Sequence, residues 1–144
     1  MTIAAILKHK GHNVISIDPT AKVPEVAATL HKNRIGAVLV IDRADQLLGI
    51  VSERDIVTSI ASNGARTLEM TAGQLMTRAI HIAHPDMTVE EAMRKMTVGR
   101  IRHLPVIHEG AIIGMVSIGD VVKSRIMRAN TEVDSLRAYI GGSA

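Results

Sequence analysis

The chain contains one structural unit twice, and this duplication restricts its possible folds more than any other feature. Residues 49–55 (GIVSERD) recur as residues 114–120 (GMVSIGD) at an offset of 65 positions. In both copies an apolar run precedes the motif and a helix-like run follows it. A repeat of this length is a supersecondary unit that buries its apolar face against its copy. We therefore expect two similar halves, and a site built by the repeat should occur twice.

Length and composition narrow the class of protein. A chain of 144 residues is long enough for a hydrophobic core but too short for two independent domains. Cysteine is absent, which excludes disulfide bonds and thiolate chemistry. No apolar stretch approaches the roughly 20 residues that a membrane span needs, and the N-terminus lacks the long apolar segment of a signal peptide. We expect a soluble cytoplasmic protein without a membrane partner.

The charged residues do not indicate a nucleic-acid or metal partner. The net charge is +3, but the basic residues are scattered. Tyr139 is the one aromatic residue, so bases would find no stacking platform. The seven histidines do not form a set with the spacing of metal ligands. Because no nucleophile elbow, P-loop or paired-carboxylate motif is present either, we do not expect an enzyme.

Hydrophobic periodicity predicts the order β-α-β-β-α in each half. In the first half, strands are expected at 14–17, 37–41 and 47–51, with one helix beginning near Val23 and another at 56–61. The second half repeats this pattern, with a capping box at the start of its first helix. Its strands are expected at 79–83, 105–107 and 112–116, and its helices near 89–96 and at 118–127.

Two further helices are expected outside the repeats. Apolar residues near the N-terminus predict a short helix that leads into a polar loop at 8–13. A separate tail helix is predicted from Val133, Leu136 and Ile140, which share one face. The resulting divisions are an N-terminal helix and loop (1–13), repeat one (14–65), a linker (66–77), repeat two (78–129) and the tail helix (130–144). The expected fold is α+β, with the two repeats packed as a pseudo-twofold pair.

Each repeat carries a serine and an aspartate three residues apart, where the last strand meets a helix. A serine hydroxyl and a helix N-terminus both favour a phosphate. An aspartate one turn into the helix can accept two hydrogen bonds from a ribose diol. The same spacing also matches a helix capping box. A cap and a ligand site are compatible, so both interpretations stay open.

The repeated segments resemble a known family. Residues 100–107 (RIRHLPVI), followed by 114–122 (GMVSIGDVV), resemble the second half of a CBS-domain pair, or Bateman module. Residues 36–40 (GAVLV), continuing through 49–55, resemble the first half. The resemblance covers roughly residues 14–127 and implies a stand-alone two-repeat protein. Members of this family bind adenosine ligands such as AMP, ADP, ATP, NAD or S-adenosylmethionine between the repeats and signal to a partner without reacting with the ligand.

The resemblance also implies two clefts, in which the aspartate of one repeat holds ribose and the strand starts of the other hold adenine. The first cleft is expected to use Ser52, Arg54, Asp55, Thr77, Ile80, Ile101, Arg102 and His103. The second is expected to use Asn13, Ile15, Ile35, Gly36, Ala37, Ser117 and Asp120. Leu104 and Pro105 are expected to shape the backbone whose amide edges read adenine.

The two expected clefts differ in charge. Arg102 and His103 stand where basic residues reach phosphate in the family, although they could also be a solvated strand end. Gly36 and Ala37 replace this pair in repeat one, and Arg54 corresponds to Gly119 in repeat two. The two sites are therefore expected to differ in ligand, or one of them stays empty.

The polar loop at 8–13 suggests a preference of the second cleft. Its lysines, Lys8 and Lys10, are expected at the mouth of the Asp120 cleft, where they could pair with a second phosphate. That would favour ADP, ATP or NAD over AMP. The alternative is a surface loop with solvated lysines.

The sequence thus predicts a regulatory module that binds an adenosine nucleotide, forms a homodimer and signals to an unidentified protein. The dimer is expected because the apolar face of the tail needs a partner surface. The alternative function is a protein-interaction module whose nucleotide clefts are vestigial.

Overall fold

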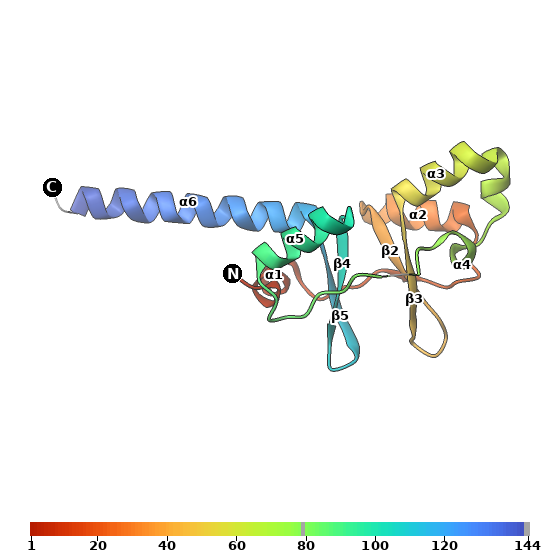
Figure 1. The fold of residues 1–144 in the computed structure, drawn as a ribbon, viewed down its shortest axis with the longest axis horizontal. Helices are drawn as coiled ribbons and strands as arrows, with labels where there is room; N and C mark the ends of the chain where they lie inside the picture. Colours follow the sequence, from red (N-terminus) through yellow and green to blue (C-terminus); the bar gives the residue numbers. More distant parts are fainter. Residues whose placement is uncertain (79, 143–144) are drawn as a thin grey trace. The chain divides into compact units, whose positions relative to one another are not determined.

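The computed structural model describes residues 1–78 and 80–142 (Figure 1). The chain divides into two compact units, and the division does not follow the order of the sequence. One unit is formed by Val14–Ile80 and the other by Met1–Asn13 together with His81–Ala144. The N-terminal segment therefore belongs with the second half of the chain.

The Val14–Ile80 unit is built on a three-stranded sheet of order β1-β2-β3, in which β1 is parallel and β3 antiparallel to β2. The central strand is buried along nearly its whole length, as its continuous apolar run predicts. The elements are β1 (Ser16–Ile17), α2 (Val23–Asn33), β2 (Ala37–Ile41), β3 (Leu47–Ser52), α3 (Glu53–Asn63), the 3-10 helix η1 (Gly64–Glu69) and α4 (Ala72–Leu75).

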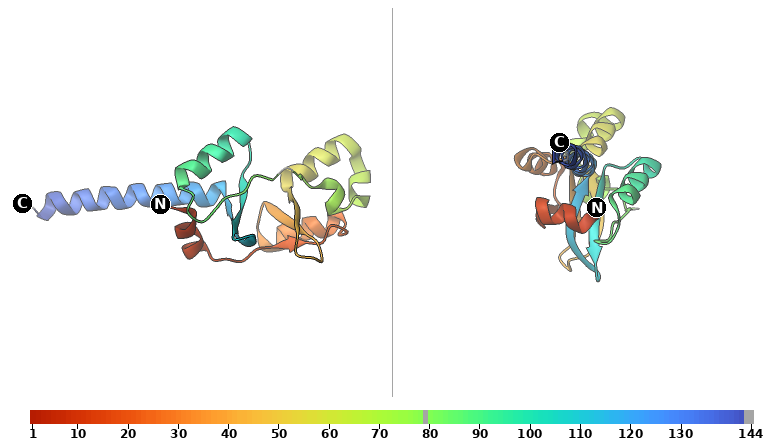
Figure 2. Two further views of the ribbon diagram at one scale, coloured as in Figure 1. Left: turned by 60° about the horizontal axis from the view of Figure 1, so that its bottom comes forward. Right: turned by 90° about the vertical axis from the view of Figure 1, so that its left-hand side faces the viewer.

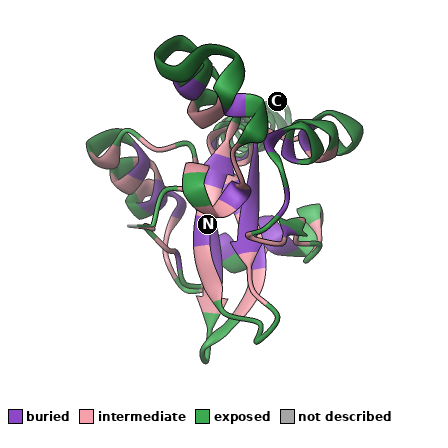
Figure 3. Cartoon of the chain, turned by 90° about the vertical axis from the view of Figure 1, so that its right-hand side faces the viewer, coloured by how far each residue is buried: buried purple, intermediate pink, exposed green. Residues whose placement is uncertain are grey.

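In this unit α2 begins at Val23 as the sequence predicts, whereas α3 extends beyond the predicted 56–61 at both ends, and η1 and α4 occupy residues predicted partly as a linker. Val23, Val26 and Leu30 form the buried face of α2, and proline stands in its first turn, where a missing N–H costs little. Gly64 ends α3 with φ of 62°, a conformation that glycine adopts without strain. Figure 3 shows the buried residues gathered on the strands and on the inner faces of the helices.

The other unit has a two-stranded antiparallel sheet, β4 and β5, and three helices. A capping box between Thr88 and Glu91 starts α5, as the sequence predicts. The elements are α1 (Ile3–Lys10), α5 (Val89–Gly99), β4 (His103–His108), β5 (Ala111–Ser117) and α6 (Ile118–Gly142).

The prediction of a strand at 79–83 is wrong for residues 80–83. Ala79 lies outside the described residues. Only Ala83 pairs with the sheet, through an isolated parallel bridge to Val106. Its N–H donates to Pro105 O (2.8 Å) and its carbonyl accepts from Ile107 N (2.9 Å). The next ladder bond toward the N-terminus would need a backbone N–H at position 105, which Pro105 lacks. The carbonyl of Ile82, which faces away from β4, accepts from Lys95 Nζ (2.7 Å).

The predicted separate tail helix and the predicted loop at 8–13 also need correction. The tail continues the last helix of the repeat, and α6 runs unbroken through Ile118–Gly142. Neither glycine nor proline occurs between Gly119 and Gly141, so nothing in that stretch interrupts the helix. The N-terminal helix likewise continues to Lys10 and ends at Gly11, whose φ is 100°.

Each unit takes in the helix that precedes the other repeat in the sequence. The N-terminal helix α1 buries Ile3, Ile6 and Leu7 in the core that α5, β4 and β5 form. The short helix α4, which precedes the second repeat, buries Ala72 in the core of the first repeat. The sequence predicts the short N-terminal helix but gives residues 66–77 as a linker, so it predicts neither α4 nor this exchange.

Two glycines make room for the exchanged helices. A Cβ atom at Gly114 would lie 2.7 Å from Leu7 Cδ2, and one at Gly49 would lie 2.6 Å from Met76 Sδ. Leu7 and Met76 therefore occupy corresponding places in the two units, as their alignment in the sequence suggests. The glycine that opens each repeated motif has a packing role: it leaves room for Leu7, which lies within α1, or for Met76, which directly follows α4.

Candidate functional site

The start of α3 is closed by a complete capping box. Asp55 N–H donates to Ser52 Oγ (3.3 Å), and Ser52 N–H donates to Asp55 Oδ2 (2.8 Å). The Ser52 hydroxyl donates to the same carboxylate oxygen at 3.0 Å. The cap that the sequence allows is therefore present at this helix start.

The start of α6 repeats this arrangement. Asp120 N–H donates to Ser117 Oγ (3.2 Å), and Ser117 N–H donates to Asp120 Oδ2 (2.8 Å). In both boxes the bonds found within the described residues go to Oδ2. The Oδ1 atoms of Asp55 and Asp120 therefore retain acceptor capacity, because a carboxylate has about four lone-pair positions.

The two aspartates differ in their cationic neighbours. Lys10 Nζ lies 2.6 Å from Asp120 Oδ2 and also donates to Met115 O (2.8 Å). The prediction that this basic segment lies beside Asp120 is confirmed, although its lysine holds the carboxylate itself. Within the part of the chain that the structure describes, Asp55 has no ion pair. The sequence indicated a charge difference between the sites, but not this pair.

The ion pair changes the acidity of Asp120. Partial burial raises the pKa of this carboxyl, but the hydrogen bonds from Lys10 and Ser117 N–H and the charge of Lys10 together outweigh that effect. The pKa of Asp120 is therefore lower than its usual value.

Replacing Lys10 should produce a pH-dependent loss of stability. A carboxyl with a lowered pKa stabilises the fold at pH values above its ordinary pKa, and this contribution disappears as the pH falls through the lowered value. Lys10→Met should cost about 1 kcal/mol or less at neutral pH, since the pair is partly exposed. Chemical denaturation from neutral to acidic pH would measure this. The difference from the native chain should vanish below the pKa of Asp120.

Lys8→Met is the matched control, because Lys8 lies on the same helix and makes no ion pair within the described residues. It should leave stability nearly unchanged at every pH. A cost of Lys10→Met that does not depend on pH would contradict the assigned ion pair.

The strand starts expected to read adenine lie beside the helix start of their own repeat. Gly36 O accepts from Glu53 N (2.9 Å), and Arg102 O accepts from Ile118 N (2.8 Å). In the ladders, Ala37 pairs with Ser52 and His103 pairs with Ser117. Each unit thus joins a strand start to a Ser-x-x-Asp motif.

Two arginines that the sequence analysis missed set the direction of these strand starts. Arg34 ends α2 and Arg100 ends α5, with positive φ of 53° and 52°. This left-handed turn lets the next residue bond back into the helix: Ile35 N–H donates to Leu30 O (3.1 Å) and Ile101 N–H to Met96 O (3.0 Å). The Arg-Ile pairs at an offset of 66 were the available signal, although arginine is uncommon in this conformation.

The remaining predicted residues have varied surroundings. Thr77 exchanges two backbone hydrogen bonds with Ile50, at 2.9 and 3.1 Å. Leu104 and Pro105 are buried in β4. Arg54, Asn13 and Arg102 are exposed, and Ile15 and Ile80 are partly exposed. Because each expected cleft combines residues of both units, these combinations remain predictions.

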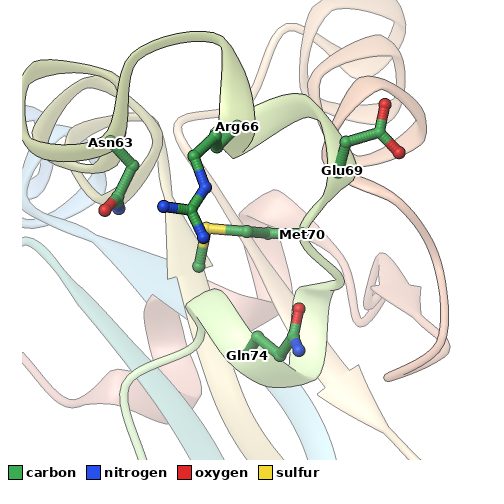
Figure 4. Close-up of a pocket in the computed structure, with 5 residues that line it drawn as sticks. All are labelled: Asn63, Arg66, Glu69, Met70 and Gln74. Atoms are coloured by element: carbon green, nitrogen blue, oxygen red, sulfur yellow. The ribbon is translucent and has the colours of Figure 1, made fainter.

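An open hollow in the Val14–Ile80 unit lies apart from these residues. Its volume is about 460 Å³, and Figure 4 shows the Arg66 side chain extending across it beside Met70. Its other lining residues, Asn63, Glu69 and Gln74, are exposed. None of the predicted binding residues contributes to it, so we do not assign the site there.

Comparison with known proteins identifies the repeated unit. The CBS domain family matches residues 7–62 and again residues 72–126. The chain belongs to the CBS-domain family. A tandem pair of CBS domains covers nearly the whole chain, and its fold is α+β. Both matched segments begin within or beside an exchanged helix, which is consistent with the packing of α1 and α4.

Curated and solved relatives agree with this assignment. The chain is 34% identical to the mitochondrial CBS domain-containing protein CBSX3 of Arabidopsis thaliana, over 98% of this chain and 72% of that protein. A CBS-domain protein of Agrobacterium tumefaciens superposes with a TM-score of 0.85 at 40% identity, over 86% of this chain and 92% of the other.

A third relative has a structure with a bound nucleotide. A CBS domain protein of Pyrobaculum aerophilum, solved in complex with AMP, superposes with a TM-score of 0.73 at 29% identity, over 83% of this chain and 89% of that one. Some other curated plant relatives are much longer, and this CBS pair spans only 21% to 24% of five of them.

Two other kinds of site are absent from the residues that the structure describes. Among the described residues, no three histidine, aspartate or glutamate side chains are grouped so that they could hold a metal ion. Within the same residues, no helix combines the length and the apolar character needed to cross a membrane.

Proposed function

We propose that this CBS pair is a regulatory module that binds an adenosine nucleotide at sites built around Ser52–Asp55 and Ser117–Asp120. The observation that carries the proposal is the duplicated capping box, in which each aspartate is fixed by the backbone and keeps an oxygen open as an acceptor. The AMP complex of a relative with 29% identity supports the choice of ligand.

The chemistry of the two helix starts suits a nucleoside better than a free anion. A fixed carboxylate accepts hydrogen bonds from vicinal hydroxyls, and a bond to a charged group is stronger than one between neutral groups. Backbone amides at the strand starts and the basic side chains of Arg102 and Lys10 are the proposed donors for base and phosphate. No group in this set acts as an activated nucleophile, so the proposed role is binding and signalling rather than catalysis.

The two sites are proposed to differ. Asp55 has no competing cation within the described residues, whereas Asp120 is bound by Lys10 at 2.6 Å. A ribose at Asp120 would have to share the carboxylate with this ammonium or displace it. A displaced Lys10 would be available to a phosphate, so the proposed preference of this site is for ADP, ATP or NAD over AMP.

The first test is stabilisation by ligand. At 100 times its dissociation constant, a nucleotide that binds only the folded state adds about 2.7 kcal/mol. The melting temperature should therefore rise by several degrees with AMP, ADP, ATP or NAD. The matching guanosine nucleotide is the control and should produce a smaller shift.

A negative result would favour the second candidate, a protein-interaction module with vestigial clefts. The specific observation behind it is that Lys10 already occupies the Asp120 carboxylate. If no adenine nucleotide changed the melting temperature or gave a calorimetric signal, the sensor function would be excluded. Mass spectrometry of small molecules released from the denatured protein would show independently which ligand the purified chain carries.

A further inference from the structure

The C-terminal half of α6 is exposed on all sides. Val121 and Ser124 are the last buried residues of this helix, and every residue at 125–141 is exposed. Arg125 and Arg128 of this helix form ion pairs with Glu90 of α5, at 3.0 and 3.4 Å. Beyond them the helix extends away from the strands of its own unit (Figures 1 and 2).

The exposed half nevertheless carries a continuous apolar seam. Its residues recur at spacings of four, three, four, three and four positions, which is the a/d pattern of a coiled coil rather than the pattern of a helix lying on a globular core. Ile126 is 55% exposed, Val133 47% and Leu136 62%. The a positions are Ile126, Val133 and Ile140, and the d positions are Val122, Ala129 and Leu136.

The residue types at these positions favour two parallel strands. The a positions hold only β-branched residues, and Leu136 is the last of the three d positions, after Val122 and Ala129. Ile or Val at a, combined with Leu at d, is the combination that favours a parallel dimer over trimers and tetramers.

The charged residues beside the seam point to the same arrangement. Glu132 is at a g position and Arg137 is at the e position five residues later. In a parallel, in-register pair, g of one helix faces this e position of the other, so symmetry forms the Glu132–Arg137 pair twice. An antiparallel pair would bring g to g and e to e. Within its own chain, Glu132 pairs with Arg128 at 3.5 Å and is 70% exposed, so its carboxylate is accessible to a second helix.

We propose that the C-terminal half of α6 binds the same segment of a second copy of this chain as a parallel, in-register, two-stranded coiled coil. A coiled coil covers the apolar seam that the rest of the unit leaves exposed. The interface is independent of the nucleotide sites and joins two CBS pairs through their C-terminal helices.

Disulfide trapping tests the orientation directly, because the full chain has no native cysteine. In a parallel, in-register coil, Ala129→Cys and Leu136→Cys should each form a disulfide between two copies under mild oxidation. Ala138→Cys lies on the outer face of the same helix and is the control. Efficient self-linking at both seam positions and little at 138 supports the proposal. Linking at only one seam position, as in an antiparallel pair, or equal linking at all three, would overturn it.

Charge reversal tests the register. In the Ala129→Cys background, Glu132→Arg or Arg137→Glu alone should reduce disulfide formation several-fold at low salt, because like charges then face each other. A mixture of the two variants should form mainly the mixed disulfide, and the double reversal should restore self-linking. Equal linking in all these samples would overturn the assigned register. Nucleotide affinity, measured on the same variants, should not change, so this proposal and the nucleotide proposal fail separately.

Discussion

Leu7→Ala should destabilise the unit that contains the second repeat by about 2–5 kcal/mol, the usual cost of removing a fully buried leucine side chain. Leu7 is completely buried in that unit although it lies near the N-terminus. Its side chain fills the space beside Gly114. Glycine has no side chain that could fill the cavity left by Leu7→Ala. Urea denaturation would measure the loss, and hydrogen exchange would locate it.

Hydrogen exchange of individual backbone amides makes this prediction specific to one unit. Amides of β4, β5 and α5 should lose protection in Leu7→Ala, whereas those of β2 and β3 should lose much less. Leu68→Ala is the matched control, because it removes the same atoms from a residue that is 51% exposed, and it should change stability by no more than about 0.5 kcal/mol. Equal costs for the two variants would contradict the packing of α1 into the second repeat.

Asp55→Ala and Asp120→Ala should each weaken adenine-nucleotide binding at one site by roughly 10- to 100-fold. This range corresponds to about 1.5–3 kcal/mol for a hydrogen bond to a charged group. Each substitution should also cost about 1 kcal/mol of stability, because it removes one half of a capping box. Titration calorimetry for affinity and denaturation for stability would separate the two effects.

The capping box of α5 provides the control for this prediction. Glu91→Ala removes the corresponding carboxylate from Thr88 N–H, but it lies outside the proposed sites. It should cost a similar amount of stability and leave nucleotide affinity unchanged. If the aspartate variants behaved like Glu91→Ala in both measurements, the aspartates would be helix caps without a role in binding.

Local patterns in the sequence determined much of each repeat. The spacing of Val23, Val26 and Leu30 predicted the buried face of α2, and the serine-aspartate spacing predicted both caps. These features depend on contacts between residues three or four positions apart, which the order of residues alone specifies. The duplicated motif and the segments around it were also sufficient to indicate the CBS family.

Weak or competing local signals explain the errors. Residues 79–83 contain the apolar residues of a strand, but a longer ladder would need a backbone N–H at position 105, and Pro105 has none. The tail was predicted as a separate helix from the shared face of Val133, Leu136 and Ile140 alone. No residue there breaks the backbone, so the helix continues.

The composition of each unit was decided only by the tertiary structure. Leu7 and Met76 align in the sequence, yet nothing local indicates that each packs against the glycine of the other repeat. The Lys10–Asp120 pair joins residues 110 positions apart, and it follows from that exchange because α1 brings Lys10 to the start of α6. Such contacts depend on which segment fills a space left by a glycine, and sequence periodicity carries no information about that choice.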